Sequence, residues 1–145
     1  PPFNLAPVSN FTPQQLDTDQ WAQGLKAMGA RYSLVLAKDE SGFLLWPTQF
    51  KWEGRLYNYT VRESPLKPAG RDLVKEYVDS ATKVGVKTGI YYLLWGNFHL
   101  GVTRKSGGAG YDCHDVHPEF EAAVLFQLEE LWSNYGQYSE IWWGT

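Results

Sequence analysis

The chain has 145 residues, of which 43% are hydrophobic and 20% are charged, which is typical of a folded globular domain and not of a disordered segment. The formal net charge is −3 and Lys and Arg form no stripe, so the sequence predicts no nucleic-acid binding. No apolar run reaches the roughly 20 residues of a membrane-spanning helix, so no transmembrane segment is predicted.

The first predicted helix follows a proline-rich lead over residues 1–16, which is expected to be extended. Asp17 or Thr18 can cap this helix, and Gly29 is expected to end it. Its apolar residues recur at helical spacing: Trp21, Ala22, Leu25 and Met28. Residues 32–37, with the sequence YSLVLA, are short, apolar and partly β-branched, which predicts a buried strand.

A second unit of the same kind follows a loop over residues 38–70. Its helix ends at Gly85, and the next strand covers residues 86–94, with the sequence VKTGIYYLL. The predicted apolar face of the helix consists of Leu73, Val74, Tyr77, Val78, Ala81 and Val84.

A third unit follows a glycine-rich loop over residues 96–117. Pro118 occupies a typical first helical position, Gly136 is expected to end the helix, and the last buried strand covers residues 139–143. The predicted apolar face of this helix consists of Phe120, Val124, Leu128, Leu131 and Trp132.

Strands joined by helical crossovers are parallel, so this repeated order predicts an α/β fold with a parallel sheet. A doubly wound sheet and a (β/α)₈ barrel both satisfy the pattern, but no G-x-G-x-x-G motif follows a strand to indicate dinucleotide binding. A complete barrel needs about 250 residues. The prediction is a single domain over residues 1–145, a partial (β/α)₈ TIM-type barrel whose open edges require other protein subunits or the missing remainder of the barrel.

Several runs of residues follow one another in a distinctive order. They are residues 11–13, 21–22 and 29–32, GFLLWPT at 42–48, residues 59–61, 64–65 and 70–74, GIYY at 89–92, residues 127–128, 130–131 and 134–136, and IWW at 141–143. In this order the sequence resembles the α-L-fucosidase family of glycoside hydrolases over nearly its whole length. The resemblance implies a catalytic barrel that acts on terminal α-L-fucosides.

Two places depart from the family pattern at strand ends. The family has K-H-H-D-G-F where this chain has Lys38-Asp39-Glu40-Ser41-Gly42-Phe43, so Asp39 and Glu40 replace two histidines that contact fucose in the family. The family's last strand carries a nucleophilic Asp at the position of Gly144. Retaining hydrolysis requires two carboxyl groups about 5 Å apart. The substitutions therefore predict a chain without catalytic activity.

Four aromatic residues lie where members of the family line their sugar cleft: Trp46, Tyr91, Tyr92 and Trp95. Aromatic rings stack on the apolar face of a sugar, and they also pack in protein cores, so both interpretations stay open. Lys38 is a further candidate for sugar binding. Asp39 and Glu40 either bind sugar hydroxyls or a cation, or belong to a solvated loop or capping turn.

Side chains able to bind metals gather before the third helix, where Cys113, His114 and His117 accompany two aspartates. Structural zinc sites usually have two separated ligand pairs, and this cluster has no second pair, so no metal and no cofactor are predicted. A zinc site in this loop is the alternative. Because Cys113 is the only cysteine, an internal disulfide is excluded.

Two N-x-[ST] triplets make Asn10 and Asn58 candidate glycosylation sites. They favour a secretory, lysosomal or extracellular location. The chain begins at Pro1 with no initiator Met, which is expected of a processed, truncated or partial polypeptide.

The functional prediction is an α-L-fucosidase-like barrel segment without catalytic activity, acting as a structural or sugar-binding subunit of a larger assembly. Fucosylated glycans are its candidate ligands. The alternative is an excerpt of an active retaining α-L-fucosidase, whose general acid and first barrel strand lie outside these residues.

Overall fold

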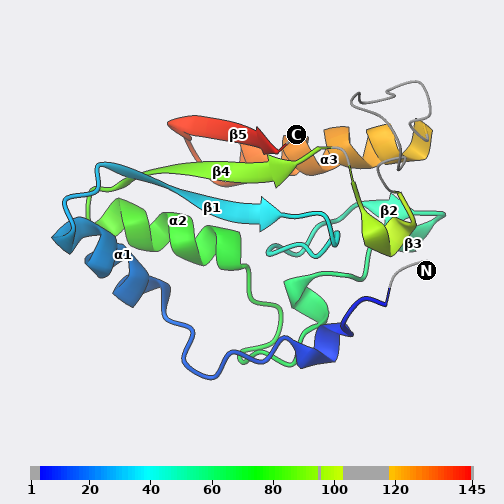
Figure 1. The fold of residues 1–145 in the computed structure, drawn as a ribbon, viewed down its shortest axis with the longest axis horizontal. Coiled ribbons are helices and arrows are strands. Elements are labelled where there is room, and N and C mark those ends of the chain that lie inside the picture. The colour runs from blue at the N-terminus through cyan, green and yellow to red at the C-terminus, as the bar shows by residue number, and fades with distance from the viewer. Residues whose placement is uncertain (1–3, 95, 103–117, 145) are drawn as a thin grey trace.

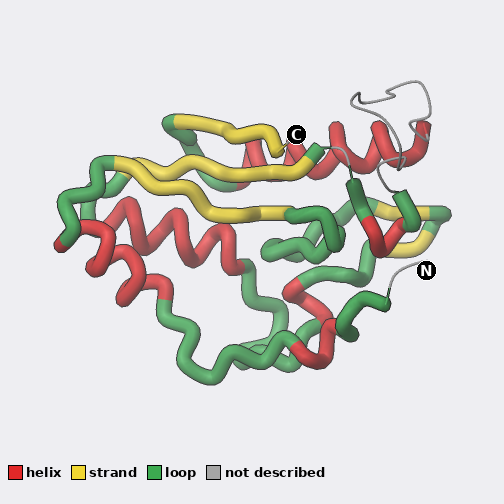
Figure 2. The backbone as a smooth tube through the Cα atoms, viewed as in Figure 1, coloured by secondary structure: helices red, strands yellow, loops and turns green. Residues whose placement is uncertain are grey.

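The computed structural model of the chain describes residues 4–94, 96–102 and 118–144. Its helices are α1 (Thr18–Ala27), α2 (Leu73–Lys83) and α3 (Pro118–Asn134), and its strands are β1 (Tyr32–Lys38), β2 (Lys51–Trp52), β3 (Arg55–Leu56), β4 (Lys87–Leu93) and β5 (Glu140–Gly144). Short 3₁₀ helices η1 (Val8–Asn10), η2 (Val61–Glu63) and η3 (Phe98–Leu100) lie in connecting segments (Figure 2). Within the described ranges, no helix is both long and apolar enough to span a membrane.

Strands β1, β4 and β5 form a parallel sheet in the order β1-β4-β5 (Figure 1). Neighbouring strands are joined by α2 and α3, which confirms the predicted helical crossovers. Val35, Ile90 and Ile141 lie side by side in the register and pack in the main hydrophobic core. The described residues thus form a small parallel sheet with helices.

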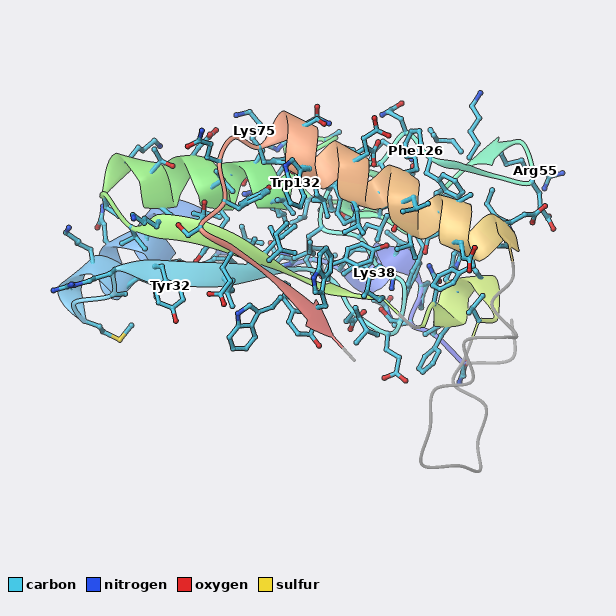
Figure 3. All side chains as sticks on the ribbon, turned by 90° about the horizontal axis from the view of Figure 1, so that it is seen from above. Tyr32, Lys38, Arg55, Lys75, Phe126 and Trp132 are labelled. Carbon is cyan, nitrogen blue, oxygen red and sulfur yellow. The ribbon has the colours of Figure 1, made fainter. Side chains whose placement is uncertain are left out.

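Helices α2 and α3 cover one face of this sheet (Figure 3). The hydroxyl of Tyr77 on α2 hydrogen-bonds the hydroxyl of Ser33 on β1. On α3, the side-chain oxygen of Gln127 accepts a hydrogen bond of 2.6 Å from the hydroxyl of Tyr92 on β4. Val35, Ile90 and Tyr92, which point to this face, are buried.

The opposite face of the sheet is not covered by any described helix (Figure 3). Leu36, Tyr91 and Trp142 are register partners across the three strands and form one row on this face. Leu36 and Trp142 are 45% and 49% exposed. The prediction that the last strand is buried is therefore wrong for Trp142, and for Trp143 as well, because β5 is an edge strand.

The helix boundaries follow the residues that the sequence predicts. Asp17 caps α1 by accepting a hydrogen bond from the backbone of Gln20, and Asp72 caps α2 in the same way. Gly29 and Gly85 follow the two helices with φ angles of 80° and 73°. These left-handed conformations favour glycine, which explains why both helices end there.

Three residues predicted to lie on apolar helix faces are instead exposed: Trp21, Met28 and Trp132. Helix α1 contacts the rest of the chain mainly through α2, so Ala22 is enclosed while Trp21 and Met28 point away. On α3, Leu131 occupies the core and its neighbour Trp132 faces outward (Figure 3). The apolar residues do recur at helical spacing, as predicted. This spacing does not show which face of the helix contacts the sheet.

The segment between β1 and α2 contains structure that the sequence pattern did not predict. Strands β2 and β3 pair antiparallel as a short hairpin. Its two turn residues, Glu53 and Gly54, have φ angles of 48° and 75°, the sign that tight hairpin turns require. A two-residue strand is too short to show an alternating pattern, so it could not be recognised.

Glu130 on α3 fastens this segment to the helix layer. Its carboxylate accepts hydrogen bonds from the indole of Trp46 at 3.0 Å, the hydroxyl of Thr48 at 2.5 Å and the backbone of Gln49 at 2.6 Å. The side chains of Trp46 and Thr48 are enclosed, so both donors depend on this acceptor.

We predict that Glu130→Ala lowers the free energy of unfolding by about 3 kcal/mol, because two enclosed donors lose a charged acceptor. Urea denaturation measures this loss. Glu129→Ala is the matched control, since Glu129 is exposed on the same helix and its loss should change stability by less than about 0.5 kcal/mol. Equal effects of the two substitutions would contradict the prediction.

Candidate functional site

The three parallel strands end at the same edge of the sheet (Figure 1). In parallel α/β folds this edge is where ligands bind. Among the described residues, it is formed by residues 38–43 after β1, by Leu94, Gly96 and Asn97 after β4, and by Gly144 at the end of β5.

Strand β1 ends in a β-bulge that redirects Lys38. Leu36 pairs with Tyr91 and Lys38 pairs with Tyr92, so one residue of β1 is left over between the two pairs. Without the bulge, Lys38 would share the uncovered face with Leu36. Instead its amine lies 5.0 Å from the centre of the Tyr92 ring, on the covered side of the sheet.

The Lys38 amine holds the backbone bend that follows β4. It donates hydrogen bonds of 2.7 Å to the carbonyl of Leu93 and 2.6 Å to the carbonyl of Gly96. Burial lowers its pKa to about 7, and the nearby charges of Asp39 and Glu40 oppose this shift. The side chain is only 1% exposed and connects strand ends, and sugar binding by Lys38 stays a prediction.

The loops after β1 and β4 are held against each other by backbone hydrogen bonds. The N–H of Phe98 donates to the carbonyl of Glu40 at 2.9 Å, and the N–H of His99 donates to the carbonyl of Ser41 at 3.1 Å. These bonds fix the backbone around Asp39 and Glu40 relative to β4. The edge of the sheet is therefore a preformed surface and not two independent loops.

A buried polar cluster completes this connection. The hydroxyl of Tyr57 donates to the carbonyl of Gly42 at 2.6 Å, and the amide of Asn97 donates to the same hydroxyl at 3.0 Å. Burial raises the pKa of Tyr57 well above its ordinary value. Gly42 is required here, because a Cβ atom would lie 2.6 Å from Cγ of Asn97 and its φ angle is 87°.

Asp39 and Glu40 stand where the resemblance places two fucose-binding histidines. Asp39 is exposed, and its carboxylate accepts hydrogen bonds from the backbone of Ser41 at 3.1 Å and from the Ser41 hydroxyl at 2.5 Å. This geometry is a capping turn. Glu40 is half-buried beside Gly96, where a Cβ atom would lie 3.5 Å from its Cγ.

Gly144 ends β5 in a space that neighbouring side chains fill. A Cβ atom at this position would lie 2.5 Å from Cδ1 of Leu93 and 2.7 Å from Cζ of Tyr91, and the Tyr91 hydroxyl would be closer still. The phenol of Tyr91 thus takes up the volume of a side chain at position 144. No carboxylate can occupy this point of the sheet edge without moving both neighbours.

Two of the predicted cleft residues lie in the core. Trp46 is 2% exposed and donates its indole N–H to Glu130, and Tyr92 is fully enclosed with its hydroxyl bonded to Gln127. Their burial favours the packing interpretation, and a place in a sugar cleft stays a prediction. Tyr91, by contrast, lies half-buried on the uncovered face.

Leu36 and Trp142, which the family motifs do not single out, flank Tyr91 in one row on the uncovered face. Trp142 lies two residues before Gly144 on the same strand, so the alternation of side chains places it on the same face as position 144. The alternation of side chains along this strand could have identified Trp142 as a neighbour of position 144. A strand predicted to be buried gives no reason to separate its two faces.

A cavity of about 300 Å³ lies beside Asp39, between the end of β1 and the segment that precedes α1. Its walls are mostly apolar and include Phe11, Phe43 and Tyr59, with Asn10 and Ser41 adding polar atoms. The cavity adjoins the end of β1, where the N–H of Leu45 donates to the carbonyl of Ala37 at 3.2 Å.

Several predicted residues lie outside the described residues: Trp95, Cys113, His114 and His117. Within the described ranges, no group of three or more His, Cys, Asp or Glu side chains is arranged to hold a metal ion. The two candidate glycosylation sites, Asn10 and Asn58, are both exposed.

Comparison with known proteins decides the family. The model of the alpha-L-fucosidase family matches residues 5–144. The chain belongs to the α-L-fucosidase family. It is 28% identical over 134 residues to Alpha-L-fucosidase 1 of Arabidopsis thaliana, covering 92% of this chain and 23% of that protein. It is 32% identical over 130 residues to Plasma alpha-L-fucosidase of Homo sapiens, covering 86% of this chain and 26% of that protein.

Solved structures of the family agree in fold. Alpha-L-fucosidase isoenzyme 1 from Paenibacillus thiaminolyticus superposes with a TM-score of 0.73 at 27% identity, over 94% of this chain and 32% of that one. The chain spans about a quarter of the length of the curated relatives named above. The family assignment therefore concerns one stretch of a larger fold.

The lowered pKa of Lys38 makes stability depend on pH. Folding favours the neutral amine, so the free energy of unfolding should rise as pH increases from about 7 toward the ordinary lysine value of 10.5. Below about pH 7 this contribution is constant. Urea denaturation across this range should show the rise in the wild type and not in Lys38→Met; parallel profiles would disprove the assignment.

We predict that Gly144→Ala destabilises the fold by about 2 kcal/mol, because the added methyl group meets Tyr91 and Leu93. The loss should shrink when Tyr91→Ala is combined with it. Gly24→Ala is the matched control: its methyl group meets nothing within 4 Å in the middle of α1, and a stability gain of about 0.5–1 kcal/mol is expected. Thermal denaturation of Gly144→Ala, Tyr91→Ala, the double variant and Gly24→Ala tests this prediction. No change of stability in Gly144→Ala would refute it.

Proposed function

We propose that this α-L-fucosidase family chain is part of a (β/α)₈ barrel that binds fucosylated glycans without hydrolysing them. The observation that carries the proposal is Gly144, which leaves no carboxylate where the resemblance places the nucleophile, and whose space the Tyr91 phenol fills. Other protein subunits or the remainder of the barrel are the proposed partners of its open edges.

The order of the strands supports the barrel. Strands β1, β4 and β5 are parallel and lie in the sheet in the order in which they occur along the chain, and one face of their sheet has no helix among the described residues. In a closed barrel that face points inward, and the side chains of each layer come from alternate strands. Leu36, Tyr91 and Trp142 point to this face, one from each of the three strands.

Both flanks of the helix layer also expose apolar side chains at a spacing of seven residues. Trp21 and Met28 form such a pair on α1, and Leu125 and Trp132 form another on α3. A helix of a barrel packs against a helix on each side. The two flanks are therefore suited to further helix-strand units preceding β1 and following β5.

The uncovered face supports sugar binding. Tyr91 and Trp142 present adjacent aromatic rings, and such rings provide flat apolar surface with a polar edge. The carboxylate of Asp39 lies at the same edge of the sheet, at the end of β1, and can accept hydrogen bonds from sugar hydroxyls. Binding therefore requires only groups that this chain retains.

Hydrolysis requires more than these groups. Glu140 lies on the same strand as Gly144, but four residues earlier, which is about 13 Å along a strand. A retaining mechanism needs its carboxyl groups about 5 Å apart at the scissile bond. Glu140 therefore cannot replace a nucleophile at position 144.

An active hydrolase is the second candidate, because the curated relatives named above are called α-L-fucosidases. Under this proposal the chain is an excerpt of a larger enzyme, and another segment supplies the missing carboxylate. The two candidates differ in a measurable way, since only the hydrolase releases the aglycone of an aryl α-L-fucoside.

The test uses the full-length protein that contains this chain. We expect L-fucose to bind in isothermal titration calorimetry, with no release of nitrophenol from a nitrophenyl α-L-fucoside. Trp142→Ala should weaken binding about tenfold, a loss near 1.4 kcal/mol. Trp132→Ala, which removes an exposed Trp from the opposite side of the sheet, should leave binding unchanged (Figure 3).

Turnover that survives in the purified protein would overturn the proposal in favour of the hydrolase. Absence of both binding and turnover would remove the sugar-binding role. Equal weakening by Trp142→Ala and Trp132→Ala would show that the uncovered face is not the binding surface.

A further inference from the structure

The triplet Asn58-Tyr59-Thr60 exposes its asparagine and buries its threonine. Asn58 is exposed at the surface, whereas Thr60 is fully enclosed, and its hydroxyl accepts a hydrogen bond of 3.1 Å from the backbone of Arg62. The two residues that define the triplet thus differ in accessibility once the chain has folded.

The oxygen of the Asn58 side chain is held by His99. Nε2 of His99 lies 3.2 Å from Oδ1 of Asn58, so the proton of that bond belongs to the imidazole. The imidazole is itself fixed: it stacks on Tyr59, with ring centres 4.6 Å apart and 12° between the planes, and meets the edge of Tyr57. The exposed side chain therefore has a defined orientation.

The Asn58 amide nitrogen remains available. The contact with His99 uses the oxygen of the Asn58 side chain and not its nitrogen. Among the described residues, no hydrogen bond involves Nδ2 of Asn58. A group attached to Nδ2 would project from an exposed position and leave the bond between Oδ1 and His99 unchanged. The fold therefore accommodates a substituent at this nitrogen.

From this geometry we infer that Asn58, and not Asn10, carries an N-linked glycan, and that the glycan is attached before the chain folds. The donor is a lipid-linked oligosaccharyl diphosphate. Nδ2 of Asn58 attacks the anomeric carbon, the bond between that carbon and the diphosphate oxygen breaks, and the diphosphate leaves with the electron pair. Nδ2 loses one proton to a base of the transferase, and no oxidation or reduction occurs.

The order of events follows from Thr60. The triplet is an acceptor because the threonine hydroxyl takes part in recognition by the transferase. In the folded chain that hydroxyl is enclosed and bonded to Arg62, so the transferase cannot reach it. Transfer at Asn58 must therefore precede folding of the segment between β3 and α2.

The other triplet is less suited to the reaction. Thr12 precedes Pro13, whose ring confines Thr12 to extended backbone and limits the bend that brings the hydroxyl toward the amide. Asn10 also borders the cavity beside Asp39, where a glycan would occupy the entrance.

The inference goes beyond sugar binding and does not rest on it. For the test, the full chain is translated behind a cleavable secretory leader in the presence of microsomes and then treated with peptide N-glycosidase. That enzyme converts a glycosylated asparagine to aspartate, so a gain of about one mass unit in a peptide identifies the modified residue.

We expect this mass gain at Asn58 and not at Asn10. The attached glycan also raises the mass of the intact chain. Asn58→Asp, which retains the oxygen that accepts from His99, should abolish this increase in mass, whereas Asn10→Asp should leave it unchanged. When solubilised microsomes are added to the chain after it has folded, the chain should remain unmodified. When they are added to the same chain kept unfolded, Asn58 should be modified.

Modification of Asn10, absence of modification at Asn58, or equal modification of folded and unfolded chain would each overturn the inference. Thr60→Ser is a further control, because it keeps both the triplet and a hydroxyl for Arg62. Loss of the glycan in Thr60→Ser would show that the mass shift does not report this triplet.

Discussion

The buried amine of Lys38 is the interaction on which the sheet edge depends. An enclosed amine is costly unless it has partners, and here the carbonyls of Leu93 and Gly96 accept from it while the Tyr92 ring lies beneath it. The amine thereby connects the end of β1 to the bend after β4. With the bend in place, Asn97 can reach Tyr57, and the two loops meet along their backbones.

This arrangement separates the residues that support the edge from those that a ligand can touch. The bulge at the end of β1 moves Lys38 to the covered side, whereas Leu36, Tyr91 and Trp142 form a row on the uncovered face. A rigid support beneath an apolar aromatic surface suits binding of a sugar ring, because little order must be gained when the ligand arrives.

The helices, their glycine ends and the parallel strands could be predicted, because each depends on the local spacing of apolar residues and on capping residues. The placement of side chains at the site could not be predicted from local sequence. Trp46 was assigned to a cleft from its position in a family motif, yet its indole meets Glu130, 84 residues later in the chain. The position of Lys38 could not be predicted because one additional residue in a strand reverses the face that follows, and no sequence pattern marks that residue.

Position 144 shows how the sheet can form without a side chain at its end. The strand pairing of Gly144 with Leu93 depends on backbone groups alone, so it requires no side chain at this position. The Tyr91 phenol fills the volume that a side chain at 144 would occupy, and it stabilises this end of the sheet by contact. Placing a carboxylate at 144 would therefore require Tyr91 to move as well. Sequence similarity along the whole chain indicates that the sheet and helices are shared with the family. Catalytic activity depends on a few side chains, which can differ even when the overall similarity is high.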